Sequence, residues 1–196
     1  DALCQKIQKM DNGVATAVFS SGMSAIVATF LTLLKAGDHV ICSRFLFGNT
    51  TSLLTTLQGY DIGITLVDAT DINDVSDAFQ ENTKMIFVET IANPVTQVSA
   101  LEEIGAFCEE KGLVYVVDNT ITSSYLFDAR IVKASLVITS LSKYVAGHGN
   151  AMGGSVTDLG FFNWETYPNI YEGYRKGDSK MWGISQIKKK GLRDMG

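Results

Sequence analysis

The stretch Leu113-Val114-Tyr115-Val116-Val117-Asp118-Asn119-Thr120 joins the most apolar short run in the chain to a polar cluster. A short run that is apolar throughout and rich in β-branched residues is typical of a strand covered on both faces, as in a parallel sheet. Similar runs occupy residues 39–42, 64–67, 85–88 and 136–139. Stretches with helical spacing of apolar residues lie between them, at 23–34, 73–80 and 100–111. This alternation predicts an α/β fold with a mostly parallel sheet and helices on both faces, to which residues 154–157 add an antiparallel strand.

Composition agrees with a globular domain and excludes several classes of protein. The 196 residues are 46% hydrophobic and 19% charged, with 2 prolines, which is typical of a chain that forms a core. With 16 basic and 21 acidic residues, the chain has no basic patch of the kind that binds nucleic acid. No apolar run approaches the roughly 18 residues of a membrane span. The three cysteines share no metal or disulfide spacing, so we expect a cytoplasmic protein.

The chain is expected to divide near residue 160. Residues 1–160 carry the alternating pattern and form the predicted large domain, whereas residues 161–196 are aromatic and rich in turns. The sequence begins without Met and ends in what reads as an unfinished helix. We therefore interpret residues 161–196 as a connector toward a C-terminal domain, and the chain as a piece of a longer protein.

Polar clusters follow several of the predicted strands. They are Ser20-Ser21-Gly22, Glu89-Thr90, Asp118-Asn119-Thr120 and Ser140-Leu141-Ser142-Lys143. In an open parallel sheet, ligands bind beyond the carboxyl ends of the strands. The clusters therefore predict one site, in which the groups come from strands that are far apart in the chain.

Each cluster taken alone has a functional and a structural interpretation. The amides that begin a helix at Gly22 can hold an anion, although Ser21 can equally be an ordinary N-cap. The cluster matches neither the P-loop nor the dinucleotide glycine pattern. A carboxylate at Asp118 needs a cationic or hydrogen-bonding partner, which a ligand or the protein itself could supply. Lys143 is either a nucleophile or a loop lysine, and Phe47 is either an aromatic platform or part of the core.

Taken together, these features match the needs of pyridoxal 5′-phosphate. The cofactor needs an anion cradle, further hydroxyls, a lysine for the Schiff base, an acid for the ring nitrogen and an aromatic ring to stack on it. The two histidines, His39 and His148, are too few and too widely separated for a metal site or a Ser/His/Asp triad. His148 is expected to be a loop residue, and no metal ligand is predicted.

The sequence resembles the Cys/Met-metabolism family of pyridoxal-phosphate enzymes, the trans-sulfuration enzymes. The matching segments are Ser20–Met23, Glu89–Pro94, Val116–Thr120 and Ser140–Tyr144 with Gly147–Gly149, and their order and spacing also agree. The resemblance covers nearly the whole chain and implies the large domain of fold type I, as in aspartate aminotransferase. It also implies a homo-oligomer, a dimer of dimers in which a neighbouring subunit completes the site.

The resemblance assigns a role to each candidate residue. It makes Lys143 the catalytic Schiff-base lysine and pairs Asp118 with the pyridine nitrogen, while Asn93 contacts the ring oxygen with Glu89 nearby. The positions assigned to cofactor binding are Ser21, Gly22, Met23, Phe47, Glu89, Asn93, Asp118, Ser140, Ser142 and Lys143. Ser142 stands where the family usually has threonine, so the hydroxyl is kept.

Two departures from the family pattern bear on function. The family usually stacks a tyrosine on the ring, whereas Phe47 can stack but cannot transfer a proton. A carboxylate leaves without an acid, so Phe47 favours γ-replacement on O-acetyl- or O-succinyl-homoserine by a sulfur donor, giving homocysteine or cystathionine. Residues 158–164 also look more like the O-acetylhomoserine sulfhydrylases of the family. The alternatives are a methionine or cystathionine lyase and a catalytically silent homologue.

The second departure is that two family elements are missing from the sequence. One is an N-terminal Tyr-x-Arg that reaches the neighbouring subunit's phosphate. The other is a C-terminal domain that carries the arginine for the substrate carboxylate. Their absence supports the interpretation of the chain as the large domain alone.

Overall fold

The structure, a computed structural model, describes residues 2–191 and 193 and contains one mixed sheet. The strand order is β1-β7-β6-β5-β4-β2-β3. The strands are β1 (Ala15–Phe19), β2 (His39–Ser43), β3 (Gly63–Val67), β4 (Thr83–Glu89), β5 (Val114–Asp118), β6 (Leu136–Thr139) and β7 (Gly154–Asp158). Strand β7 runs antiparallel to both of its neighbours, and the other pairs are parallel. The predicted sheet and its antiparallel addition are confirmed.

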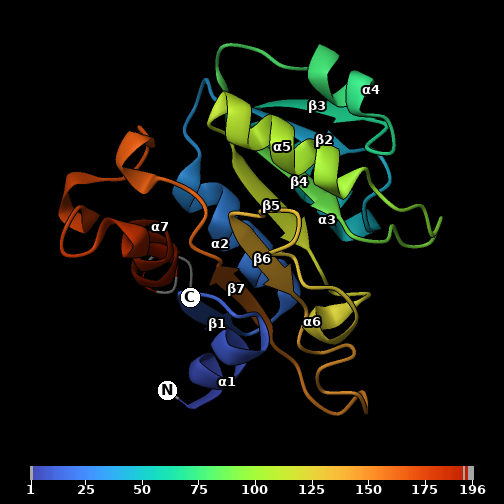
Figure 1. Cartoon of the computed structure of the whole chain (residues 1–196), viewed down its shortest axis with the longest axis vertical. Helices are drawn as coiled ribbons and strands as arrows, with labels where there is room; N and C mark the ends of the chain where they lie inside the picture. Colours follow the sequence, from blue (N-terminus) through green and yellow to red (C-terminus); the bar gives the residue numbers. More distant parts are fainter. Residues whose placement is uncertain (1, 192, 194–196) are drawn as a thin grey trace.

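Helices cover both faces of this sheet. They are α1 (Ala2–Met10), α2 (Gly22–Leu33), α3 (Gly48–Gln58), α4 (Ile72–Asp77), α5 (Leu101–Lys111), α6 (Ser123–Leu126) and α7 (Trp182–Gln186), followed by a π-helical segment at Ile187–Gly191. Buried residues of α2, α3 and α7 belong to one core cluster, and those of α4 and α5 belong to a second. Figure 1 shows α5 in front of the sheet and α2 behind it.

Strand β5 shows why the sheet is buried on both faces. Val114 and Val116 pack into the α2 cluster, and Tyr115 and Val117 pack into the α5 cluster. Both faces of a central parallel strand must be apolar, because helices cover each of them. The edge strand β3 is covered less well, and its Leu66 remains 45% exposed.

The structure differs from the sequence-based prediction in five helices. Helices α1, α3, α6 and α7 were not expected, and α4 ends at Asp77 rather than at Gln80. Helix α3 has the sequence GNTTSLLTTLQ, in which four threonines lower helix propensity and only two leucines are buried. Packing of Leu54 and Leu57 into the α2 cluster stabilises this helix, and a local pattern does not reveal such packing.

The segment after β7 packs against the carbonyl end of α2. Trp164, Tyr167 and Ile170 are buried in the α2 cluster. The Tyr167 hydroxyl donates to the Leu33 carbonyl over 2.7 Å, and Asn169 Nδ2 donates to the same carbonyl over 2.8 Å. The last carbonyls of a helix have no intrahelical donor, so these side chains satisfy them. This part of the expected connector thus packs on the large domain, and the position of the domain boundary stays a prediction.

Gln186 makes the third of these contacts, and its removal should destabilise the protein. Its Nε2 donates to the carbonyls of Thr32 and Asn169 over 2.6 and 3.0 Å, and its Oε1 accepts from Tyr171 N over 2.9 Å. Gln186 is fully buried, so Gln186→Ala leaves these groups without partners and should lower the free energy of unfolding by about 2–4 kcal/mol. Urea unfolding followed by the fluorescence of Trp164 and Trp182 measures the change. The exposed Gln58→Ala on α3 is the control, and equal effects of the two substitutions would contradict the prediction.

Candidate active site

The predicted site residues lie at the carboxyl edge of the sheet. Strands β2, β4, β5 and β6 are parallel and β1 runs in the same direction, so the loops that follow them meet at this edge. Glu89 and Asp118 are the last residues of β4 and β5 and are register partners. Their preceding neighbours, Val88 and Val117, point into the α5 cluster. Both acids therefore project toward the side of the sheet that carries α2 and α3.

The amide end of α2 has the form of an anion cradle. Ser21 is its N-cap, and the Ser21 hydroxyl accepts from Ser24 N over 3.0 Å. The Ser21 carbonyl accepts from Ala25 N over 3.1 Å. The amides of Gly22 and Met23 precede these bonds and have no acceptor within the helix. Helix starts with such free amides bind phosphate groups, so the N-cap interpretation of Ser21 and the cradle interpretation of Gly22 and Met23 are compatible.

The loop after β6 approaches this cradle closely. A Cβ atom built on Gly22 would lie 2.7 Å from Ser140 Cβ, so only glycine allows α2 and this loop to come so near. Ser142 Oγ accepts from Gly153 N over 3.0 Å and thus joins the loop to the start of β7. Lys143 lies in the next turn, where its N donates to the Ser140 carbonyl over 3.2 Å, and its side chain is exposed.

Asp118 has no cationic partner among the described residues. Their ion pairs are Arg44–Asp74, Lys111–Glu110 and Lys133–Glu109. Burial raises the pKa of the Asp118 carboxyl, and hydrogen bonds from Thr120 partly oppose this shift. A carboxyl in this state would ionise more readily beside a bound cation. The protonated ring nitrogen of a pyridoxal group is such a cation.

Glu89 connects two loops of the site. Its Oε1 accepts from Phe47 N over 2.7 Å, and its Oε2 accepts from Asn93 N over 3.3 Å. The residue is only 8% exposed, whereas Phe47 is 42% exposed and Asn93 is also exposed. Burial is the main cause that raises the pKa of Glu89 to about 7, and the charge of Asp118 contributes.

Thr120 is a site residue to which the sequence analysis assigned no role. Its N donates to Asp118 Oδ1 over 2.9 Å, and its Oγ1 accepts from Ser140 N over 2.8 Å. It thereby ties the end of β5 to the end of β6. An aspartate whose side chain accepts from the backbone N two residues later forms a common Asx turn, so the bond from Thr120 N to Asp118 could have been predicted from the sequence. The bond from Ser140 N to Thr120 could not, because no local pattern indicates it.

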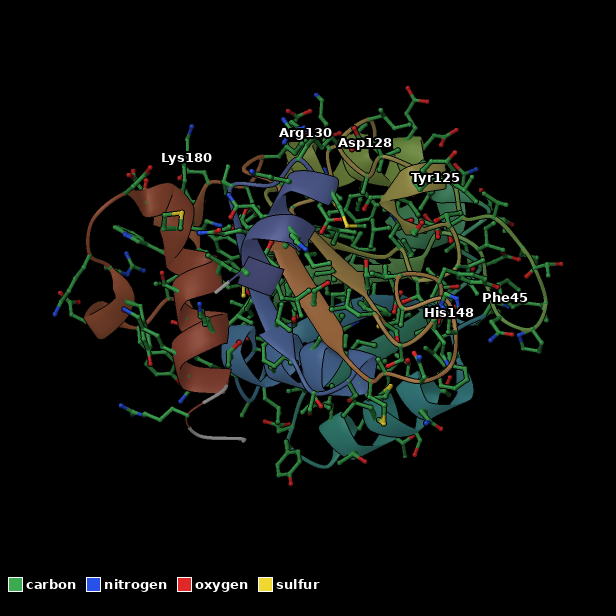
Figure 2. All side chains as sticks on the ribbon, turned by 90° about the horizontal axis from the view of Figure 1, so that it is seen from below. Phe45, Tyr125, Asp128, Arg130, His148 and Lys180 are labelled. Atoms are coloured by element: carbon green, nitrogen blue, oxygen red, sulfur yellow. The ribbon has the colours of Figure 1, made fainter. Side chains whose placement is uncertain are left out.

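The remaining sequence-based expectations can also be placed. His148 is exposed, as a loop histidine should be, and its Nδ1 lies 3.0 Å from the Ala146 carbonyl. Within residues 2–191 and 193, no group of histidine, cysteine and acidic residues is placed to hold a metal ion. No helix in the same part of the chain combines the length and apolar character needed to cross a bilayer. Figure 2 shows Phe45, Tyr125 and His148 on one side of the molecule, in segments that follow β2, β5 and β6.

Gly154 permits the closest backbone approach at the cradle and provides a test of its geometry. A Cβ atom at this position would lie 2.1 Å from Ser21 O and 2.6 Å from Gly22 N. Gly154→Ala must therefore displace the start of α2, and we expect pyridoxal phosphate to bind about 10- to 100-fold more weakly, as overpacking of 1–3 kcal/mol implies. Titration of the cofactor's absorbance measures the affinity. Gly173→Ala, where the added Cβ meets no atom within 4 Å, is the control; an unchanged affinity in Gly154→Ala would contradict this account of the cradle.

Fold and site together define a pyridoxal-phosphate enzyme of the α/β class, and the comparisons specify its family. A sequence profile of the Cys/Met metabolism PLP-dependent enzymes matches residues 1–184, and the chain belongs to this family. L-Methionine gamma-lyase of Fusobacterium nucleatum subsp. polymorphum is 35% identical over 153 residues, which are 77% of this chain and 39% of that protein. The chain thus spans well under half the length of this curated relative.

Solved structures show the same likeness. The O-acetylhomoserine sulfhydrylase of Wolinella succinogenes superposes with a TM-score of 0.90 at 34% identity, over 99% of this chain and 55% of that one. A structure from Campylobacter jejuni that carries pyridoxyl-lysine monophosphate has a TM-score of 0.89 at 25% identity, over 98% of this chain and 49% of that one. Pyridoxal 5′-phosphate is the cofactor of the family to which the chain belongs.

The residues of this chain fit that cofactor. A Cβ added at Gly22 would collide with Ser140 beside the cradle, and two amides at the start of α2 lack intrahelical acceptors. Burial raises the pKa of Asp118, and no cation among the described residues is paired with it. Candidate partners of the cofactor lie at one edge of the sheet: Gly22 and Met23 for the phosphate, Asp118 for the ring nitrogen and Lys143 for the covalent linkage.

Proposed function

We propose that the intact protein catalyses γ-replacement on O-acetyl- or O-succinyl-homoserine with a sulfur nucleophile, giving homocysteine or cystathionine. The observation that carries this proposal is Phe47, whose backbone N is bonded to Glu89 at the edge of the site and whose ring has no ionisable group. A thiolate leaving group gains from a proton donor at this position, whereas acetate or succinate leaves without one. The structural likeness to an O-acetylhomoserine sulfhydrylase supports the same assignment.

Each group of this chain has a defined task in the proposed reaction. When bound, pyridoxal phosphate supplies an electron sink for the charge that develops on the substrate. Gly22 and Met23 hold the phosphate through their amides, with the Ser140 hydroxyl beside them. Asp118 keeps the ring nitrogen protonated. Lys143 Nζ holds the cofactor before substrate arrives and then removes and returns the proton at the substrate's α-carbon.

Elimination is the second candidate function. Its support is the relative named L-methionine gamma-lyase, which is 35% identical to this chain. A lyase of this kind would need another group, or water, in place of a tyrosine at Phe47.

One experiment separates the two functions. The intact protein is incubated with O-acetylhomoserine, O-succinylhomoserine or methionine, each with and without sulfide or cysteine, and the products are identified by mass spectrometry. Homocysteine or cystathionine that forms only with a γ-ester and a sulfur donor supports γ-replacement. An α-keto acid and ammonia released from methionine without a donor would establish elimination instead.

Assembly and location belong to the same proposal. We infer a dimer of dimers in which a neighbouring subunit completes the site. Exposed apolar side chains on α6 and in the loop between β6 and β7 support this; they include Tyr125 (91% exposed), Tyr144 and Met152. A cytoplasmic location agrees with three cysteines that form no disulfide.

A further inference from the structure

One carboxylate bridges two loops that are distant in the sequence. The Glu89 carboxylate accepts hydrogen bonds from two backbone amides. One belongs to Phe47, 42 residues before it, and the other to Asn93, 4 residues after it. One amide follows β2 and the other follows β4, and each occupies a different carboxylate oxygen. A carboxylate that accepts two amide bonds in this way fixes the separation of the two loops.

On the Phe47 side of this bridge, the Phe47 carbonyl accepts from Thr50 N over 2.9 Å and from Thr51 N over 3.1 Å, whereas among the described residues its backbone N is held by Glu89 alone. Phe47 is the N-cap residue of α3, and its side chain makes no capping hydrogen bond. Phe47 is 42% exposed and belongs to neither core cluster, so core packing fixes this residue only in part. Because Glu89 bonds to Phe47 N, its negative charge lies at the amide end of an 11-residue helix, where the helix dipole stabilises an anion. Loss of that charge would loosen the residue from which the ring projects.

We propose that ionised Glu89 is a positioning residue that holds Phe47 and Asn93 in register, so that Phe47 stacks on the cofactor ring. This inference rests on the proposed roles of Phe47 and Asn93 toward pyridoxal phosphate. Because one carboxylate supports both residues, the contacts of Phe47 and Asn93 with the cofactor should form together and be lost together.

The surroundings of Glu89 set the pH at which this support is lost. Asp118 on β5 is the charged group that raises the pKa of Glu89, whereas the amides of Phe47 and Asn93 lower it, and burial dominates to bring it to about 7. The ion pairs of the described residues join other acids, so none of them holds Glu89 ionised. As the pH falls through 7, Glu89 takes up a proton and one of its oxygens becomes a donor. The bridge then weakens on acidification and is complete above pH 7.

The test compares Glu89→Gln with the wild-type intact protein in two measurements. Amide hydrogen exchange of the apoprotein at pH 8, read in peptides that contain Phe47 or Asn93, should be faster in Glu89→Gln because the amide side chain keeps only one acceptor oxygen. Pyridoxal phosphate should bind the variant about tenfold more weakly at pH 8, as expected for a lost hydrogen bond to a buried charged group. Between pH 8 and pH 6, the wild-type affinity should fall toward that of the variant.

Two further variants keep the test decisive. Glu102→Gln on the exposed face of α5 is the matched control and should follow the wild type in both measurements. Phe47→Ala should bind the cofactor weakly with less pH dependence than the wild type, a comparison that requires no change at Glu89. Unchanged exchange at Phe47 and Asn93 in Glu89→Gln, or equal pH dependence in Phe47→Ala and the wild type, would overturn the proposal. Neither measurement depends on which substrate is turned over, so failure of γ-replacement would be seen separately.

Discussion

Replacement of Lys143 by alanine is expected to abolish turnover, lowering kcat by on the order of 10⁴- to 10⁶-fold, as loss of an essential nucleophile does. The residue follows β6 in a turn that begins at Ser140, and that serine lies against the Gly22 cradle. This arrangement places the backbone of Lys143 at the edge of the sheet that carries Asp118. None of the other described residues assigned to the site has a side-chain amine, so we expect none of them to replace its chemistry.

Covalent attachment of the cofactor gives a second measurement for Lys143. Borohydride reduction of the wild-type protein should fix the cofactor to the peptide that contains Lys143, and mass spectrometry should locate it. Lys143→Ala should bind the cofactor without becoming labelled. Lys133→Ala is the control, since Lys133 is exposed and pairs with Glu109 across 2.6 Å, away from the site. Label on another residue in Lys143→Ala, together with full activity, would disprove the assignment.

Replacement of Asp118 by asparagine is expected to lower kcat by on the order of 10²- to 10³-fold, the usual cost of losing a preorganised electrostatic partner. Asparagine retains an oxygen that can accept from Thr120 N, which preserves the turn but removes the charge. Asp118 would supply the charge that keeps the ring nitrogen of a bound cofactor protonated, so the variant would lack the group that maintains the electron sink. Cofactor affinity should change much less than kcat.

The same substitution should also shift the titration of Glu89. Because the charge of Asp118 raises the pKa of Glu89, its removal should move the acid-dependent loss of cofactor affinity to lower pH. Asp77→Asn on the exposed end of α4 is the control for both effects. An Asp118→Asn protein with wild-type kcat would show that the carboxylate does not serve the ring nitrogen.

Local sequence patterns predicted those parts of the structure that are determined locally. Strand β5 and the acid at its end could be recognised because four apolar residues and a carboxylate are consecutive in the sequence. The amide end of α2 could be recognised from Ser21 and Gly22 for the same reason. Contacts such as those of Glu89 with Phe47, and of Thr120 with Ser140, join residues 42 and 20 positions apart and depend on how the strands align. Helix α3 was missed because packing stabilises it more than propensity does.

Helix α2 is held at both ends by residues that come late in the chain. Its amide end lies against Ser140 and Gly154, and its carbonyl end is capped by Tyr167, Asn169 and Gln186. During synthesis, the first 160 residues, which include Ser140 and Gly154, therefore emerge before the groups that cap the carbonyl end of this helix are available. The helix is held at both ends only after Gln186 has joined the fold, so we expect stable cofactor uptake to belong to the last stage of maturation of this domain.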